Sequence, residues 1–181
     1  MAKRAVERHH MTKLPRFQVR KRERKNMADN FDERSGLIFS EAPWGKWGQT
    51  IEDVQILIKV DKGTVSKAIK CNIYPKKIRV VIKENTILEG NLFDKVVADE
   101  CIWTLEDRED LRITLVKVNK DAANCWKSLL EDKFPVDPWT FSEMEKKMVL
   151  ERFQRENPGF DFSKSDVSGN FHGGGPSLPG Q

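Results

Sequence analysis

Ile102-Trp-Thr-Leu-Glu-Asp-Arg-Glu-Asp-Leu-Arg-Ile-Thr-Leu-Val-Lys117 is the stretch that decides the fold of this 181-residue chain. Apolar and polar residues alternate on both sides of an acidic centre, so that the side chains of Leu111 and Ile113 share one face. Alternation of this kind is typical of a strand that buries one face against a core. The stretch therefore predicts two antiparallel strands, over residues 101–105 and 111–118, which a turn joins.

The acidic centre, Glu106-Asp-Arg-Glu-Asp110, is a place where paired carboxylates could divide acid and base roles. An Arg separates the acids, and a turn tip between two strands offers no pocket that would raise the pKa of a carboxyl group. We interpret it as a solvated hairpin turn. All three histidines, which are His9, His10 and His172, lie outside the predicted fold, so the sequence indicates a protein that is not an enzyme.

Short alternating runs continue the same pattern upstream. Their apolar members are Val54, Ile56, Ile58 and Val60, then Ile69, Cys71 and Ile73, and then Ile78, Val80 and Ile82. Asp61-Lys-Gly63 and Lys83-Glu-Asn85 supply turns, and Thr86 to Leu92 forms a further strand that Gly90 is expected to kink or bulge. Regular short strands with turns between them predict an all-β fold, an antiparallel sandwich of seven or eight strands.

After the last of these strands the apolar period becomes helical. Asp121 can cap a short helix over residues 122–130. Asp137-Pro138 is a stronger start signal, with Asp as N-cap and Pro at the first helical position. We expect this second helix to run from Pro138 to about Glu156, where Asn157-Pro-Gly159 ends it.

The second helix carries two apolar arcs. One arc gathers Phe141, Met144 and Met148, and the other gathers Trp139, Val149, Leu150 and Phe153. Two interpretations remain open. One domain wraps around both arcs, with Phe160 and Phe162 folding back, or one arc packs on the sandwich while the other meets a partner or a second copy, which would form a homodimer.

Positive charge is confined to the first residues. Residues 1–27 hold ten Lys or Arg and two Glu, a net charge of +8, whereas residues 28–181 hold 22 Lys or Arg and 26 Asp or Glu, a net charge of −4. A basic run of this kind is typical of a solvated arm, and the acidic remainder disfavours a nucleic-acid partner. Met27 is a candidate start codon, which would make the first 26 residues an extension outside the native protein.

The chain divides into four parts by composition. They are a disordered leader at 1–40, a β-sandwich at 41–119, a helical extension at 120–162 and a disordered Gly-rich tail at 163–181. No apolar run approaches the length of a membrane helix, and charges occupy the place of a secretory signal. We therefore expect no membrane partner and a location in the cytosol or nucleus.

The cysteines argue against metal or disulfide chemistry. Cys71, Cys101 and Cys125 are odd in number, widely spaced and without a Cys-x-x-Cys pair. We expect reduced, mostly buried thiols, with no cofactor and no metal.

Several motifs together resemble one known family. They are Pro43-Trp-Gly-Lys-Trp-Gly-Gln-Thr50, Leu88-Glu-Gly-Asn-Leu-Phe-Asp94, Trp103-Thr-Leu-Glu-Asp-Arg108, Asp121-Ala-Ala-Asn-Cys-Trp126, Asp137-Pro-Trp139 and Leu150-Glu-Arg-Phe-Gln-Arg-Glu-Asn-Pro-Gly-Phe-Asp-Phe162. Over about residues 30–170 the chain resembles the nuclear distribution protein C family, which is built on a CS domain. The basic extension before Met27 departs from that family.

The resemblance implies the alpha-crystallin-like sandwich of small heat-shock proteins and of the heat-shock protein 90 co-chaperones, with no cofactor or reaction. It implies a co-chaperone or scaffold that acts with heat-shock protein 90 and stabilises clients such as the lissencephaly protein of the dynein pathway. The implied location is the cytoplasm, with the centrosome and spindle as candidate sites. The alternative is a stand-alone holdase or structural interaction module, independent of heat-shock protein 90.

The candidate partner-binding residues are aromatic, cationic and large apolar side chains, because aromatic and Arg anchors tend to dominate protein interfaces. They are Trp44, Trp47, Tyr74, Lys76, Lys77 and Arg79 on the sandwich, and Leu150, Phe153, Phe160 and Phe162 in the carboxy-terminal segment.

Overall fold

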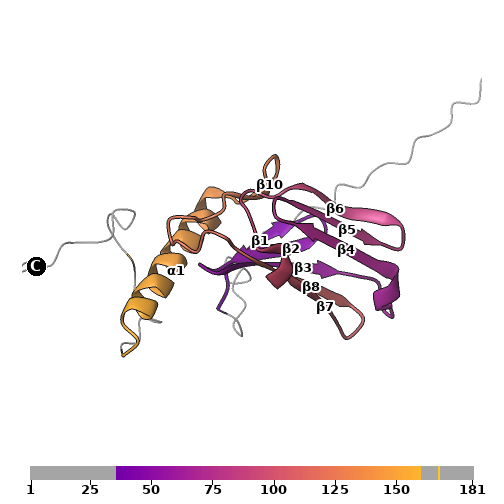
Figure 1. Cartoon of the computed structure of the whole chain (residues 1–181), viewed down its shortest axis with the longest axis horizontal. Coiled ribbons are helices and arrows are strands. Elements are labelled where there is room, and N and C mark those ends of the chain that lie inside the picture. Colours follow the sequence, from indigo (N-terminus) through magenta and orange to yellow (C-terminus); the bar gives the residue numbers. More distant parts are fainter. Residues whose placement is uncertain (1–35, 160–166, 168–181) are drawn as a thin grey trace, which may run out of the picture.

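The computed structural model describes residues 36–159 and Val167 (Figure 1). Its strands are β1 Phe39–Ala42, β2 Gly45–Gln49, β3 Asp53–Lys59, β4 Ile69–Tyr74, β5 Lys77–Ile82, β6 Asn85–Asn91, β7 Ile102–Glu106, β8 Asp110–Val116, β9 Ser128–Leu130 and β10 Lys133–Pro135. One α-helix, α1, spans Pro138–Glu156 and lies at one end of the sheets (Figure 1). Sheets of five and three antiparallel strands confirm the predicted sandwich of seven or eight strands, and β9 and β10 pair as a further, two-stranded sheet.

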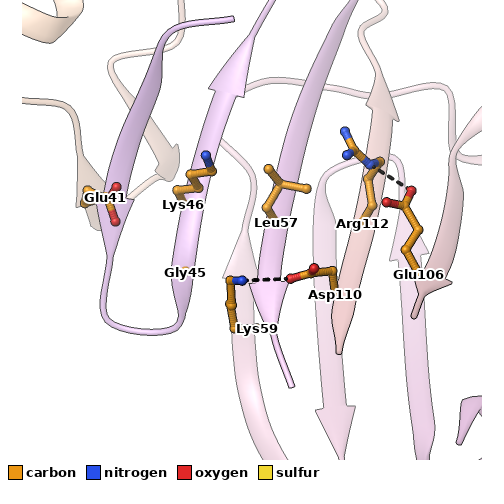
Figure 2. A pocket seen from close by; sticks show the side chains of 8 residues that line it. All are labelled: Glu41, Gly45, Lys46, Leu57, Lys59, Glu106, Asp110 and Arg112. Carbon is orange, nitrogen blue, oxygen red and sulfur yellow. Dashed lines mark hydrogen bonds and ion pairs between the residues drawn. The ribbon is translucent and has the colours of Figure 1, made fainter. Parts of the chain in front are cut away.

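The larger sheet has the order β1-β2-β3-β8-β7. Its pairing follows from the alternation in the sequence, because Ile56 lies opposite Ile113 and both side chains point into the core. The opposite face of this sheet carries charged side chains such as Lys46 and Arg112 (Figure 2). The sheet therefore has one buried and one solvated face, as the sequence predicts.

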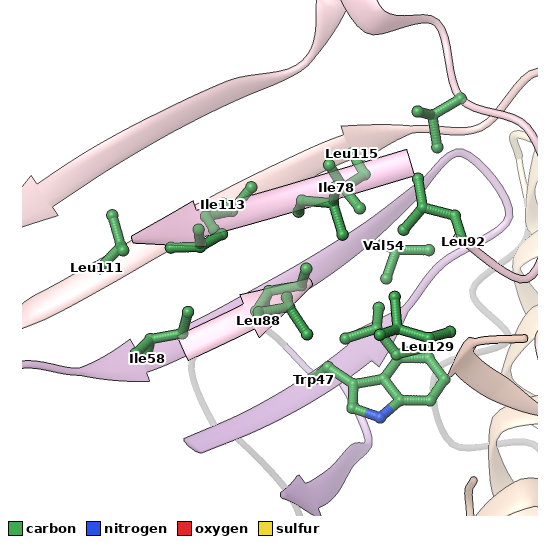
Figure 3. Packing of buried hydrophobic residues seen from close by; sticks show 14 of the residues in the cluster. Trp47, Val54, Ile58, Ile78, Leu88, Leu92, Leu111, Ile113, Leu115 and Leu129 are labelled. Carbon is green, nitrogen blue, oxygen red and sulfur yellow. The ribbon is translucent and has the colours of Figure 1, made fainter. Parts of the chain in front are cut away.

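The smaller sheet has the order β4-β5-β6, and its inner face closes the core. Ile78 and Leu88 are fully buried against the larger sheet (Figure 3). Val80 is fully buried in the same core. The expected irregularity occurs, but not at Gly90. Val80 pairs with Leu88 and Val81 with Thr86, so Ile87 is the extra residue of the bulge.

Gly90 pairs regularly with Ile78 and is needed for space, because a Cβ there would lie 2.7 Å from the Leu130 Cδ1 atom. The prediction that Gly90 forms the bulge is therefore wrong. Gly90 instead lets β9 approach β6 closely, because it has no side chain.

The short helix predicted over 122–130 is absent from the structure. The Asp121 carboxylate accepts a hydrogen bond from the Ala123 N–H at 2.9 Å, which makes a local turn, and Ser128–Leu130 form β9. Phe93 N–H donates to the Leu129 carbonyl at 3.2 Å, so β9 extends alongside the end of β6. Tertiary pairing has overridden the local capping signal here.

Helix α1 begins and ends at the predicted residues. The Asp137 carboxylate accepts from Thr140 N–H at 3.0 Å, Pro138 is the first helical residue, and Asn157 is the C-cap. The first apolar arc is buried, because Met144 and Met148 pack with residues of the sandwich end and of the 117–128 connection. Those neighbours are Ile38, Ile51, Ala122 and Cys125.

The sandwich begins earlier than the predicted boundary at Glu41. Leu37, Ile38 and Phe39 are buried, and β1 starts at Phe39, so residues 37–40 belong to the fold and not to the leader. Ile38 was missed because it packs under α1, which lies far away in the sequence. The disorder expected for residues 1–35 lies outside the described residues, and so does that expected for the tail, apart from Val167.

Candidate functional site

The candidate residues lie in several parts of the fold, and the outer face of β4 and β5 holds three of them. Tyr74 is 52% exposed. Lys77 and Arg79 lie beside one carboxylate, that of Glu89, with Lys77 Nζ at 3.8 Å and Arg79 Nε at 3.5 Å from it. Both cations keep about half of their side-chain surface in solvent. The structure thus gathers these predicted residues on one accessible surface, which we call the cationic face.

Lys76 is next to this face but has a structural role. Its Nζ donates to the Phe93 carbonyl at 2.8 Å and lies 3.2 Å from the Glu131 carboxylate. Glu131 also accepts from the Asn91 side chain at 3.2 Å, and the pKa of Glu131 is lowered by these hydrogen bonds. Lys76 therefore ties the β4–β5 turn to the β9–β10 hairpin.

The two tryptophans expected on the surface are not equivalent, and for Trp47 the expectation is wrong. Trp47 is fully buried, because its place opposite Ile56 directs the indole into the sandwich (Figure 3). Trp44 is half-buried and meets Phe134 edge to face at 5.4 Å between ring centroids. Trp47 cannot contact a partner in the folded protein, and Trp44 keeps only a partial surface for one.

Only two of the four carboxy-terminal candidates lie in the described part of the chain. Leu150 and Phe153 are half-buried on α1, and Trp139 of the same arc is 39% exposed. Phe160 and Phe162 lie outside the described residues. Whether this second arc meets a partner or a second copy stays a prediction.

The outer face of the larger sheet contains a shallow hollow of about 370 Å³ around Leu57 (Figure 2). Two ion pairs cross it, Lys59 with Asp110 at 3.4 Å and Arg112 with Glu106 at 3.1 Å. Each of these two cations thus has its own acid, and the lining as a whole holds as many acids as cations. We call this surface the sheet hollow, and its matched charges distinguish it from the cationic face.

A buried lysine, Lys117, joins the sandwich to α1 and is not among the residues predicted from the sequence. Lys117 is fully buried, and its Nζ donates to Gln49 Oε1 at 2.9 Å, to the Thr50 carbonyl at 2.8 Å and to the Asn124 carbonyl at 3.3 Å. The signal was present in the sequence, because Lys117 continues the inward-facing series of Leu111, Ile113 and Leu115.

Gln49 is the second member of this buried junction. Its Nε2 donates to the Trp126 carbonyl at 3.0 Å, and its Oε1 accepts from Trp126 N–H at 2.8 Å. The same Nε2 lies 3.3 Å from Cys125 Sγ and 3.5 Å from Met144 Sδ of α1. The junction therefore fixes the 117–128 connection, and through it the helix, against the sandwich.

Burial controls protonation in this junction. It lowers the pKa of Lys117 to about 8 and raises the pKa of Cys125 to about 12. It also raises the pKa of Glu151, whose carboxylate accepts from Ile51 N–H at 2.9 Å. A thiol held neutral in this way is a poor nucleophile, so Cys125 has a packing role.

The lowered pKa of Lys117 predicts that raising the pH stabilises the wild type relative to the variant Lys117→Met. Below pH 8 the ammonium is charged in both the folded and unfolded states, and above pH 8 the folded state releases its proton first, so the folded state gains stability. Relative to Lys117→Met, wild type should gain about 1 kcal/mol of unfolding free energy between pH 8 and 9.

Urea titrations of both proteins at the two pH values measure this gain. The two proteins must be compared because the thiols act in the opposite direction in both of them. A raised thiol pKa, such as the value of about 11 for Cys71, lowers the unfolding free energy as the pH rises. The other groups that face Lys117 are Cys125, Glu151, Asp53 and Asp94. If the difference in unfolding free energy between wild type and Lys117→Met did not change with pH, the lowered pKa of Lys117 would be contradicted.

Neither a candidate metal cluster nor a candidate membrane-spanning helix occurs in the described residues. Among residues 36–159 and Val167, no group of three or more His, Cys, Asp or Glu could hold a metal ion. In the same part of the chain no helix is long and apolar enough to cross a membrane.

Comparison with known proteins identifies the family. Residues 43–117 match the CS domain. NudC domain-containing protein 2 from human and from mouse is 49% identical over 152 residues, covering 84% of this chain and 97% of each relative. The nuclear movement protein nudc of Schizosaccharomyces pombe is 28% identical, covering 65% of this chain and 90% of that protein.

A crystal structure of mouse NudC domain-containing protein 2, 49% identical in sequence, covers 72% of this chain and all of that chain with a TM-score of 0.41. The identity to the full-length relatives confirms the predicted resemblance. This chain belongs to the nuclear distribution protein C family, within the group of NudC domain-containing protein 2, and carries the CS domain of that family.

Proposed function

We propose that this chain is a non-enzymatic co-chaperone or scaffold that binds and stabilises client proteins together with heat-shock protein 90. The observation that supports it best is the cationic face, where Tyr74, Lys77 and Arg79 stand exposed on a rigid sheet. Exposed aromatic and Arg side chains on a fixed backbone lose little entropy on binding and are typical interface anchors.

The proposed clients belong to the pathway that positions nuclei, with the lissencephaly protein of the dynein pathway as the first candidate. Membership of the family supports this, and so do the names of two relatives, the nuclear movement protein of fission yeast and the nuclear migration protein nudC of Drosophila melanogaster. The proposed location is the cytoplasm, including the centrosome and spindle.

Loss of the cationic face should release the chaperone and the client. In pull-downs of tagged protein from cytosol, Tyr74→Ala plus Arg79→Glu is expected to recover about tenfold less heat-shock protein 90 and lissencephaly protein than wild type does, because anchors carry most binding energy. Mass spectrometry of the recovered proteins measures the effect. Circular dichroism must first show that the variant is folded, and undiminished recovery would eliminate this surface.

The alternative is a holdase that shields unfolded proteins without heat-shock protein 90. The purified chain would then suppress aggregation of citrate synthase without any added chaperone. The shallow sheet hollow around Leu57 is the surface in the described residues that favours this alternative, since its apolar centre and polar rim resemble a small contact patch.

A further inference from the structure

Positive charge inside the fold is concentrated in one segment. Residues 62–83 contain seven Lys or Arg and no Asp or Glu. Over residues 36–159 as a whole the signs nearly balance, with 20 Lys or Arg and 21 Asp or Glu. The segment includes β4 and β5, so the smaller sheet holds a local excess of positive charge that the total hides.

Strand register places much of this charge on the outer face. Arg79 lies between Asn72 of β4 and Glu89 of β6, and Lys77 lies beside Tyr74. Lys70 shares this face, because the inward positions of β4 belong to Ile69 and its alternate residues. The outward side chains of β4 and β5 are therefore polar except for Val81, which lies opposite Lys70, and Tyr74 stands at the other end of the face.

One acid serves two cations on this surface. Glu89 lies 3.5 Å from Arg79 and 3.8 Å from Lys77, and Lys70 has no ion pair with a described residue. These distances exceed those of strong charge-assisted hydrogen bonds, and the side chains are half exposed. The cationic face thus keeps about two positive charges in excess, unlike the sheet hollow, where cations and acids are matched.

The edge of the same sheet is open to an extended chain. The order β4-β5-β6 leaves one side of β4 without a neighbouring strand in the described structure. Asn72 and Tyr74 project from this edge strand toward the cationic face. An extended segment alongside β4 could use unpaired backbone groups and place its own carboxylates above Lys70, Lys77 and Arg79.

We infer that the cationic face binds an acidic segment of a partner protein, rich in Asp and Glu and carrying an apolar residue beside Tyr74. This inference deepens the proposed function and rests on it. A nucleic acid fits less well, because Tyr74 is the single aromatic side chain on the face and single-stranded nucleic acids are usually held by several stacked bases.

The test uses the full chain and a short dye-labelled peptide in which Glu alternates with Leu, followed by fluorescence anisotropy. Wild type should bind this peptide at low salt and lose affinity as salt is raised, because screening weakens surface charges. Lys77→Glu plus Arg79→Glu should weaken binding by about tenfold or more. The same peptide with Gln in place of every Glu should bind as weakly to wild type.

Lys120→Glu plus Lys127→Glu is the matched control. It changes net charge equally at two exposed lysines of the 117–128 connection. Equal loss of affinity in this control would overturn the inference, since net charge and not the face would be responsible. Equal binding of the Gln peptide would overturn it as well.

Two other occupants are tested in the same way. Tighter binding of a labelled single-stranded oligonucleotide than of the Glu peptide would overturn the inference in favour of nucleic acid. A dimer seen by light scattering in wild type and lost in Lys77→Glu plus Arg79→Glu would assign the face to a second copy. Chaperone recovery in pull-downs tests the proposed function separately. If wild type recovers the chaperone and Tyr74→Ala plus Arg79→Glu does not, a failed peptide titration overturns only the acidic segment.

Discussion

Replacing Gln49 with Ala is expected to lower the unfolding free energy by about 3 to 5 kcal/mol, the range seen when one partner of a buried charge is removed. Gln49 Oε1 is an acceptor for the buried Lys117 ammonium at 2.9 Å, and the same side chain pairs both backbone groups of Trp126. The substitution leaves all of these groups without that partner. Urea unfolding followed by Trp fluorescence measures the loss.

A double-mutant cycle separates the lysine from the backbone. In a Lys117→Met background the loss caused by Gln49→Ala should fall to about 1 to 3 kcal/mol, because only the Trp126 groups remain unpaired. The matched control is Gln55→Ala, on the solvated face of the same sheet, where the loss should be about 1 kcal/mol or less. Equal losses in both Lys117 backgrounds would contradict the coupling.

Gly45→Ala should destabilise the protein by about 3 kcal/mol or more, since a strained backbone and a steric overlap act together. Gly45 has a φ of 152°, and a Cβ there would overlap the Leu57 carbonyl oxygen of the paired strand β3. The neighbouring strand cannot move away without breaking the β2–β3 ladder. Thermal unfolding of the purified variant measures this change.

Gly63→Ala provides the comparison for that result. Gly63 also has a positive φ, of 80°, but a Cβ there would meet no atom within 4 Å. Its substitution should cost about 1 to 2 kcal/mol, from backbone conformation alone. Equal costs at the two glycines would show that the overlap with Leu57 is relieved by small shifts.

The sequence predicted what local chemistry determines. Alternation placed Ile56 and Ile113 on inward faces, and capping residues placed both ends of α1, because a strand face and a helix cap depend on near neighbours. The cationic cluster of Tyr74, Lys77 and Arg79 was also found, since one hairpin carries all three residues.

Features that depend on distant partners were missed. Asp121 has the character of a helix cap, yet residues 128–130 form β9 because they pair beside the end of β6. Trp47 was expected outside, although its register with Ile56 sends it inward. The burial of Lys117 was not predicted because a lysine is rarely fully buried. Hydrogen bonds to the carbonyls of Thr50 and Asn124 and to Gln49 offset the loss of hydration of its ammonium group.

The buried junction has a consequence for how this protein can be divided. The CS region ends at Lys117, yet Trp126, Leu129 and Leu130 fill the same core, and Asn124 completes the lysine's acceptors. A fragment cut after Lys117 would expose an apolar wall and leave an ammonium with too few partners. The segment that matches the CS domain is therefore shorter than the unit that shares this core, and it cannot be transplanted without the connection that follows it.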